Sequence, residues 1–268
     1  MNNIFSFGRF WKYFIHDLKN AKNYFLLSGI IIGIMPVLTY LVFEIFNVVA
    51  LGHWQAGNVA LQVISFALVL ILGAYIFPAK VYGRITDQGA GSSWLMIPAS
   101  TFEKWLSMML ICLVVLPVFL AVLCFGSDAL LSALIPNYGR SMMFYALESD
   151  SIIADTIGEG IELNLPLLAF CEWTESILPF VLGAVLFKRA KVGKTFLALM
   201  ALGMVSTPVF TFIFGTSHIG PDVIESVVNS VSVQQIFHKI NIVISVYYLV
   251  FAVLLMALTY LRLKTIKH

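Results

Sequence analysis

The chain has 268 residues, of which 60% are hydrophobic and only 11% are charged, with a formal net charge of +2. Soluble globular domains are usually about 45–50% apolar and about 25% charged. This composition excludes an ordinary water-soluble domain and favours a fold that is solvated by lipid. The three cysteines lie singly in apolar stretches without a C-x-x-C spacing, which is typical of small buried side chains rather than redox or metal sites.

The first 23 residues have the pattern of an amphipathic helix. Apolar residues such as Phe7, Trp11 and Phe14 recur at helical spacing, and basic residues such as Arg9 and Lys12 fall on the other side. A helix of this kind lies in the membrane interface, with its aromatic side chains buried and its basic groups near anionic headgroups. We therefore expect an interfacial helix over residues 1–23. The alternative is a helix that packs on another subunit in the cytoplasm.

Six stretches are long enough and apolar enough to cross a bilayer. A spanning helix needs about 20 mostly apolar residues, because the hydrocarbon core is about 30 Å thick. The stretches that meet this requirement are 24–46, 59–77, 106–134, 165–187, 195–214 and 242–263. They are continuous apolar runs without the alternation of barrel strands. The sequence therefore predicts an all-α integral membrane protein, in which residues 1–268 form one domain with six transmembrane helices.

The basic residues predict how this domain is oriented. Of the sixteen Lys and Arg residues, all but Arg140 and Lys239 lie before the first stretch, at or after the end of the last, or in the loops that follow the second and fourth. Loops that are rich in Lys and Arg stay in the cytoplasm. The pattern predicts a multi-pass protein with both the N and the C terminus in the cytoplasm.

The predicted cytoplasmic loop between the second and third spans contains an unusual apolar cluster. Pro78 and Gly83 are expected to end the second helix, and Ser100 with Glu103 has the spacing of a capping box that begins the third. Between them, residues 94–97 read Trp-Leu-Met-Ile. An apolar cluster that is exposed to water is costly unless another surface packs over it. The cover is either the membrane and the helix bundle or a cytoplasmic partner, and the residues alone leave both open.

The stretch from Arg84 to Lys104, which reads Trp-Leu-Met-Ile-Pro-Ala-Ser-Thr-Phe-Glu-Lys over residues 94–104, resembles permease subunits of type-2 ATP-binding-cassette exporters from Bacteroidetes-like bacteria. The plan of an interfacial helix and six spans is also similar, although the loop after the third span is longer here. In that family the loop between the second and third spans docks on the ATPase.

The resemblance implies a particular set of partners and contacts. The partners would be a separate cytoplasmic ATPase subunit and a second permease bundle, either identical or related, in the bacterial inner membrane. The implied docking residues are Arg84, Asp87, Trp94, Glu103 and Lys104.

Two carboxylates, Glu172 and Glu175, fall well inside the fourth predicted span. Their i, i+3 spacing places them on one helix face, and a charge at the membrane centre costs roughly 2.5–3.5 kcal/mol or more. We expect them to face the bundle interior, a substrate path or a partner helix. The alternative is that the span begins later and Glu172 lies at the interface. The expected polar partners lie in other spans: Ser28, Thr39 and Thr207.

Motifs for catalysis do not occur in the chain. Gly193-Lys194-Thr195 matches the last three positions of the phosphate-binding motif G-x-x-x-x-G-K-[ST]. The first glycine of that motif is replaced by Lys188, so the motif is incomplete. The sequence contains neither H-E-x-x-H nor G-x-S-x-G. We therefore expect no enzyme activity, cofactor, metal site or nucleic-acid partner, with ATP hydrolysis on another chain.

The interpretation that follows from the resemblance is an exporter permease subunit. Two alternatives belong to other classes. One is a membrane anchor that assembles a complex without transport, and the other is an ion-coupled carrier that uses Glu175.

Overall fold

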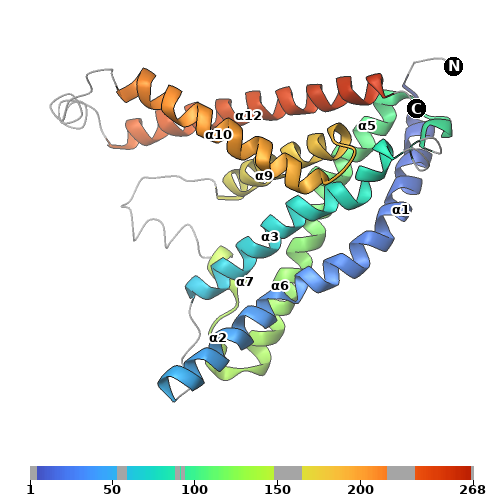
Figure 1. Cartoon of the computed structure of the whole chain (residues 1–268). Coiled ribbons are helices and arrows are strands. Elements are labelled where there is room, and N and C mark those ends of the chain that lie inside the picture. The colour runs from blue at the N-terminus through green and yellow to red at the C-terminus, as the bar shows by residue number, and fades with distance from the viewer. Residues whose placement is uncertain are drawn as a thin grey trace.

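The computed structural model describes residues 5–52, 59–87, 91, 94–147, 165–215 and 233–266. These residues form helices and turns, and no strand occurs among them, in agreement with the predicted helical fold class. The elements in chain order are α1 (Phe7–Gly33), α2 (Met35–Leu51), α3 (Val59–Val81), η1 (Gly83–Thr86), α5 (Thr101–Leu110), η2 (Ile111–Val115), α6 (Leu116–Leu134), η3 (Pro136–Tyr138), α7 (Met142–Leu147), α9 (Leu165–Leu186), α10 (Lys191–Gly215) and α12 (Val233–Thr265) (Figure 1).

Three helical stretches of the described chain are long and apolar enough to cross a membrane. They are Leu61–Thr86, Thr101–Leu134 and Ser245–Thr265. Their exposed faces carry large apolar side chains such as Val118, Val122 and Leu254, which lipid solvates better than water. Helix α2 is apolar but shorter. These features agree with a membrane protein.

Helix α1 joins the expected interfacial helix to the expected first span. The sequence analysis expects the interfacial helix to end at residue 23 and the first span to begin at residue 24. The structure has one continuous helix, α1, from Phe7 to Gly33, and the change from interface to span stays a prediction. The helix instead breaks at Ile34, and Pro36 lies in the first turn of α2. Proline is favoured there, because its missing N–H would have no helical acceptor. The stretch 24–46 is thus divided between two helices.

The first half of α1 has one exposed and one buried apolar face. Phe7, Trp11 and Ile15 are exposed along one side, whereas Phe10 and Tyr13 are buried. The buried face lies against α5, and α1 also packs on α3 and α6. The exposed row suits an interfacial helix, which stays a prediction. The protein contact on the other face was not expected from the amphipathic pattern.

The end of α3 lies later than the sequence analysis expected. Pro78 was expected to break this helix, but α3 continues through Pro78 to Val81 and passes into the 3₁₀ turn η1 at Gly83. Proline removes one backbone donor, yet its own carbonyl still accepts a hydrogen bond from Tyr82 N at 3.0 Å. One missing bond therefore does not end the helix here.

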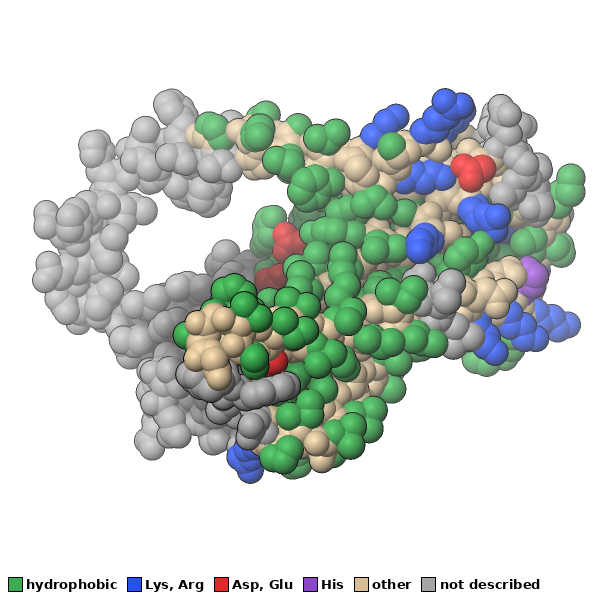
Figure 2. Space-filling view, turned by 60° about the horizontal axis from the view of Figure 1, so that its bottom comes forward, with side chains coloured by type: hydrophobic (Ala, Val, Ile, Leu, Met, Phe, Trp, Pro, Cys, Tyr) green, Lys and Arg blue, Asp and Glu red, His purple; other side chains and the backbone are tan. Residues whose placement is uncertain are grey.

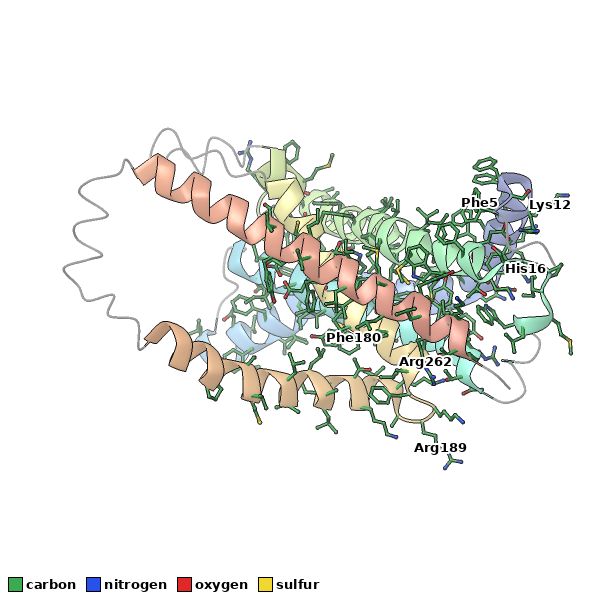
Figure 3. The ribbon with its side chains drawn as sticks, turned by 90° about the horizontal axis from the view of Figure 1, so that it is seen from above. Phe5, Lys12, His16, Phe180, Arg189 and Arg262 are labelled. Carbon is green, nitrogen blue, oxygen red and sulfur yellow. The ribbon has the colours of Figure 1, made fainter. Side chains whose placement is uncertain are left out.

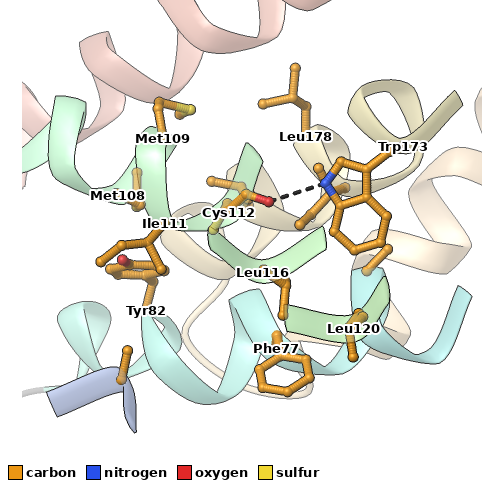
Figure 4. Close-up of a cluster of buried hydrophobic side chains, with 14 of the residues drawn as sticks. Phe77, Tyr82, Met108, Met109, Ile111, Cys112, Leu116, Leu120, Trp173 and Leu178 are labelled. Carbon is orange, nitrogen blue, oxygen red and sulfur yellow. Dashed lines mark hydrogen bonds between the residues drawn. The ribbon is translucent and has the colours of Figure 1, made fainter. Parts of the chain in front are cut away.

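The third predicted span begins as the sequence indicated. The Ser100 side chain accepts from Glu103 N, and the Glu103 side chain accepts from Ser100 N, which is a complete capping box. The helix contains a π segment, η2, directly before α6. Such a segment leaves a backbone carbonyl available, and the indole N–H of Trp173 donates to the Cys112 carbonyl oxygen at 3.1 Å (Figure 4). The π segment thus ties α9 to the third helix.

Helix α9 is the centre of the packing. It contacts α3, α10 and α12, and its side chains Ile177, Leu178 and Val181 are fully buried. Its bounds, Leu165–Leu186, agree with the predicted span 165–187. At Gly183 the helix lies so close to α10 that an added Cβ would overlap Thr195 Oγ1. A second pair of glycines, Gly29 and Gly33 of α1, packs against α6 within the chain.

Lys and Arg side chains gather toward one end of the molecule (Figure 2). The labelled Lys12, His16, Arg189 and Arg262 all lie at this end (Figure 3), and both chain ends lie there as well (Figure 1). We call it the basic end. It is built from the start of α1, η1 with residue 87 and the turn at residues 94–100, the start of α5, the α9–α10 turn and the end of α12.

Candidate functional site

All five residues of the expected docking contact lie at the basic end, but they do not form one exposed surface. Glu103 and Lys104 are buried, Trp94 is half-buried, and Arg84 and Asp87 are exposed. The structure therefore divides them into residues that brace this end and residues that present a surface.

Glu103 anchors the start of α1 to the start of α5. Its side chain is 0% exposed, and Arg9 Nη2 lies 2.7 Å from Oε1 while Arg9 Nε donates to Oε2 at 2.8 Å. The backbone N–H groups of Ser6 and Ser100 donate to the same carboxylate at 3.0 and 2.8 Å. A bidentate guanidinium contact fixes orientation as well as distance. Glu103 is thus a brace within the chain rather than a surface contact.

A second carboxylate, Asp17 of α1, is buried in the same contact between α1 and α5. Its Oδ2 accepts hydrogen bonds from Ser107 Oγ at 2.7 Å and from Tyr82 Oη at 3.2 Å. Burial raises the pKa of Asp17 above its ordinary value, and the two hydrogen bonds oppose that rise. Asp17 therefore connects α1 to α5 and to Tyr82, which lies between α3 and η1.

Trp94 points into the basic end. Its indole N–H donates to Tyr13 Oη at 3.1 Å. Lys104 Nζ donates to the Trp94 carbonyl oxygen at 2.8 Å and lies 4.4 Å from the centre of the indole ring, a distance suited to a cation–π contact. Trp94 and Lys104 thus hold the turn at residues 94–96 against α1 and α5.

Arg84 and Asp87 connect η1 to other elements at this end. Arg84 Nη1 donates to Tyr24 Oη of α1 at 2.6 Å. Asp87 Oδ1 lies 3.1 Å from Lys191 Nζ at the start of α10, and the same ammonium group donates to the Gly83 carbonyl oxygen. A displacement of residues 83–87 would therefore reach α1 and α10 directly.

An exposed apolar pair, Leu95–Met96, lies on the turn that follows η1, in addition to the exposed apolar residues of α1 such as Phe7 and Trp11. Met96 is 81% exposed and Leu95 is 41% exposed, although both side chains are large and apolar. They follow Trp94 in one helical turn and lie beside the braces already described. We call residues 95–96 the apolar tip.

A cavity of about 500 Å³ opens between α1 and the turn that carries Trp94. Its wall combines polar side chains of α1, among them His16, Asn20 and Asn23, with Arg84 and Trp94. The cavity lies directly beside the apolar tip. It has the size of a small-ligand pocket, and its lining is mixed in polarity.

The expected intramembrane pair lies on the side of α9 that faces α12. Glu172 Oε1 accepts a hydrogen bond from Tyr248 Oη of α12 at 2.8 Å. Glu172 is exposed and Glu175 is half-buried. The hydrogen-bond partner of Glu172 is thus Tyr248, which was not among the partners expected from the sequence. Thr39, one of the expected partners, donates instead to backbone carbonyls of its own helix. The side chains of Ser28 and Thr207 lie outside the described residues.

Sequence reasoning missed three residues that organise the basic end. Asp17 and Tyr13 received no role in the sequence analysis, and Lys191 was counted only among the basic residues of the loop after the fourth predicted span. A signal for Asp17 was present, because it is the one acidic residue among the basic residues of the first 23 positions.

No protein-family model matches this chain, and comparison with curated proteins and with solved structures found no significant match.

Proposed function

We propose that the chain is the membrane-spanning permease subunit of an ATP-driven exporter, coupled to a separate cytoplasmic ATPase. In this proposal the protein has six spans, the basic end faces the cytoplasm, and two permease bundles, identical or related, form the transport path in the bacterial inner membrane. The observation that carries the proposal is an exposed apolar tip on a turn that is braced to α1 and α5.

The bracing suits a turn that transmits a conformational change from a docked partner to the helices. A coupling element needs an exposed surface for docking and a stiff connection to the helices that move. The apolar tip supplies the surface. Trp94 with Tyr13 and Lys104 supplies the connection to α1 and α5, while Asp87 with Lys191 connects the neighbouring η1 to α10.

The division between braces and tip changes the residues that should be tested. Substitution of Trp94, Glu103 or Lys104 would disturb the fold, because all three are held inside the basic end. Met96 is the better probe of docking, since its side chain is 81% exposed and its loss removes no contact within the chain that the structure shows.

The test is association of the chain in nanodiscs with an ATP-binding-cassette ATPase encoded beside it. Met96→Asp should weaken binding by roughly tenfold or more, because a charge would be desolvated in an apolar contact. The matched control is Met143→Asp in α7, an exposed methionine (53%) outside the basic end, and it should leave binding unchanged. Equal binding of the two variants contradicts the docking proposal. An intact complex without ATP-dependent flux favours the assembly component.

A second candidate function rests on Glu172 and Glu175. A carboxylate that meets a tyrosine of another apolar helix is suited to an ion-coupled carrier. That candidate predicts transport without an ATPase that is abolished by Glu175→Gln. Persistent transport in this variant would exclude the carrier.

A further inference from the structure

The cavity at the basic end has polar walls that come from two elements. Its volume is about 500 Å³, within the range of small-ligand pockets. From α1 it is lined by His16, Asn20 and Asn23, which are exposed and share one helix face because of their spacing. From η1 it is lined by Arg84. Imidazole, amide and guanidinium groups thus line one hollow that is large enough for a small molecule.

Arg84 is held at the wall of this cavity by Tyr24, which lines the cavity as well. Arg84 Nη1 donates to Tyr24 Oη at 2.6 Å, and the guanidinium carbon lies 6.0 Å from the centre of the Tyr24 ring. A guanidinium group carries five N–H donors, and among the described residues Tyr24 Oη is the acceptor that it contacts. The other N–H groups of this exposed side chain form a planar fork, which suits the oxygen atoms of an anion.

The charged side chains that neighbour the cavity are mainly basic. Lys12 and Lys19 of α1 are exposed. Each lies four residues before a lining residue, Lys12 before His16 and Lys19 before Asn23, so these side chains are neighbours on the helix surface. Figure 3 shows Lys12 and His16 together at this end. With Arg84, the two lysines bring three cations to the cavity, and clustered cations attract anions.

The carboxylates that the structure describes at the basic end compensate little of this charge at the cavity. Asp17 is the one carboxylate among the described residues that line it. The Asp17 side chain is only 8% exposed, and it accepts from the hydroxyl groups of Ser107 and Tyr82. Glu103 and Asp87 are each paired with a basic residue of the chain. The surroundings of the cavity therefore favour a negatively charged ligand.

The cavity also has an apolar wall. Val81 and Ile85 line it from the end of α3 and from η1, and Ile97 and Trp94 line it from the turn that follows. A small inorganic anion has no apolar part to place against these side chains. An anionic group that is bonded to a small organic group matches both walls.

We propose that this cavity binds a phosphate monoester of a small organic group, with Arg84 as the principal phosphate ligand and the Asn23 amide as a further donor. A phosphate monoester has three acceptor oxygens and carries about two negative charges. This matches donors from two elements and several nearby cations better than a carboxylate does, since a carboxylate has one plane of acceptors and one charge. The monoester belongs either to a lipid headgroup or to a soluble solute, because the chemistry is the same. The inference is independent of the exporter proposal.

A ligand at this position contacts α1 and η1 together. It should therefore hold residues 83–87 against α1, in addition to the existing bond between Arg84 and Tyr24. A ligand that binds only the folded chain also raises its unfolding temperature. Stability thus reports binding without any assumption about what the protein transports.

The first experiment uses glycerol phosphate as a soluble probe and the chain in phosphatidylcholine nanodiscs. Sodium chloride at equal ionic strength is the reference. Tryptophan fluorescence reports binding, because Trp94 lines the cavity, and the unfolding temperature should rise with the probe. The second experiment adds phosphatidic acid, which carries the same monoester, or phosphatidylglycerol to the chain in detergent, and native mass spectrometry measures the lipid that is retained. Saturable binding of glycerol phosphate supports a soluble ligand, and preferential retention of phosphatidic acid supports a lipid.

Arg84→Gln should weaken whichever interaction occurs on the order of tenfold, because it removes charge-assisted hydrogen bonds. Arg189→Gln is the matched control. It removes the same charge from an exposed position at the same end that does not line the cavity, and it should leave binding unchanged. Asn23→Leu keeps Arg84 and its bond to Tyr24, so it tests the site even if Arg84→Gln does not fold. It should weaken binding about threefold.

Three results overturn the proposal. The first is a wild-type chain that binds neither glycerol phosphate nor phosphatidic acid. The second is an equal effect of Arg84→Gln and Arg189→Gln on binding, which would reduce the interaction to the general charge of the basic end. The third is unchanged binding in Asn23→Leu.

Discussion

The close approach of α9 and α10 gives a sharp prediction for Gly183. An added Cβ would overlap Thr195 Oγ1 and come within 2.8 Å of Thr195 Cβ. Thr195 is buried, and its hydroxyl donates to the Lys191 carbonyl oxygen at 2.8 Å, so it has little room to yield. Overpacking of this kind costs about 1–3 kcal/mol. Replacement of glycine by alanine in a helix contributes up to about 1 kcal/mol in the other direction.

Gly183→Ala should therefore lower the free energy of unfolding by about 1–2 kcal/mol. The assay is unfolding in mixed detergent micelles, followed by tryptophan fluorescence. Thr195→Ala removes Oγ1 and Cγ2, two of the three atoms that an added Cβ would meet, and keeps the Cβ of residue 195, so the double variant should recover part of the stability lost by Gly183→Ala. Stability equal to that of the wild type, or strictly additive losses in the double variant, would refute the close helix contact.

Three further predictions test the packing of the bundle core and of the basic end. Trp173→Phe removes the donor to the Cys112 carbonyl and should lower stability by about 1 kcal/mol; an unchanged unfolding midpoint would count against the bond. Burial raises the pKa of Asp17 above 3.8, so the folded chain holds this proton more tightly than the unfolded chain. The contribution of Asp17 to stability should therefore fall as the pH rises above 3.8, because the folded chain loses the advantage of its tighter proton. The unfolding temperature of Asp17→Asn should not show that fall. If wild type and Asp17→Asn change in parallel with pH, the buried position of Asp17 is contradicted. Lys191→Met breaks the link to Asp87 and should speed hydrogen exchange at residues 83–87; unchanged exchange would show that the link does not hold this segment.

The sequence predicted the features that depend on local chemistry. Apolar length placed α9 within one residue of its observed end. The capping box at Ser100 and Glu103 correctly located the start of the third helix. Both signals depend on residues that are neighbours in the chain. The helical class follows from the same reasoning.

The features that the sequence did not predict depend on residues that are distant in the chain. Helix α1 passes through residue 24 because its buried face, with Phe10 and Asp17, packs on other helices over most of its length. The sequence left open whether the helix bundle or a partner covers Trp94; its direction depends on Tyr13, 81 residues earlier in the chain. Pattern and spacing contain no information about such contacts.

The central claim is that the basic end, with its apolar tip, faces the cytoplasm. The most direct test is the labelling of Met96→Cys by a membrane-impermeant maleimide in cells. Cys112 and Cys124 are buried and Cys171 is only partly accessible, so the unsubstituted chain gives the background. We predict labelling of Met96→Cys only after the membrane is permeabilised, and labelling of Met143→Cys in intact cells. Labelling of Met96→Cys from outside intact cells would contradict the account.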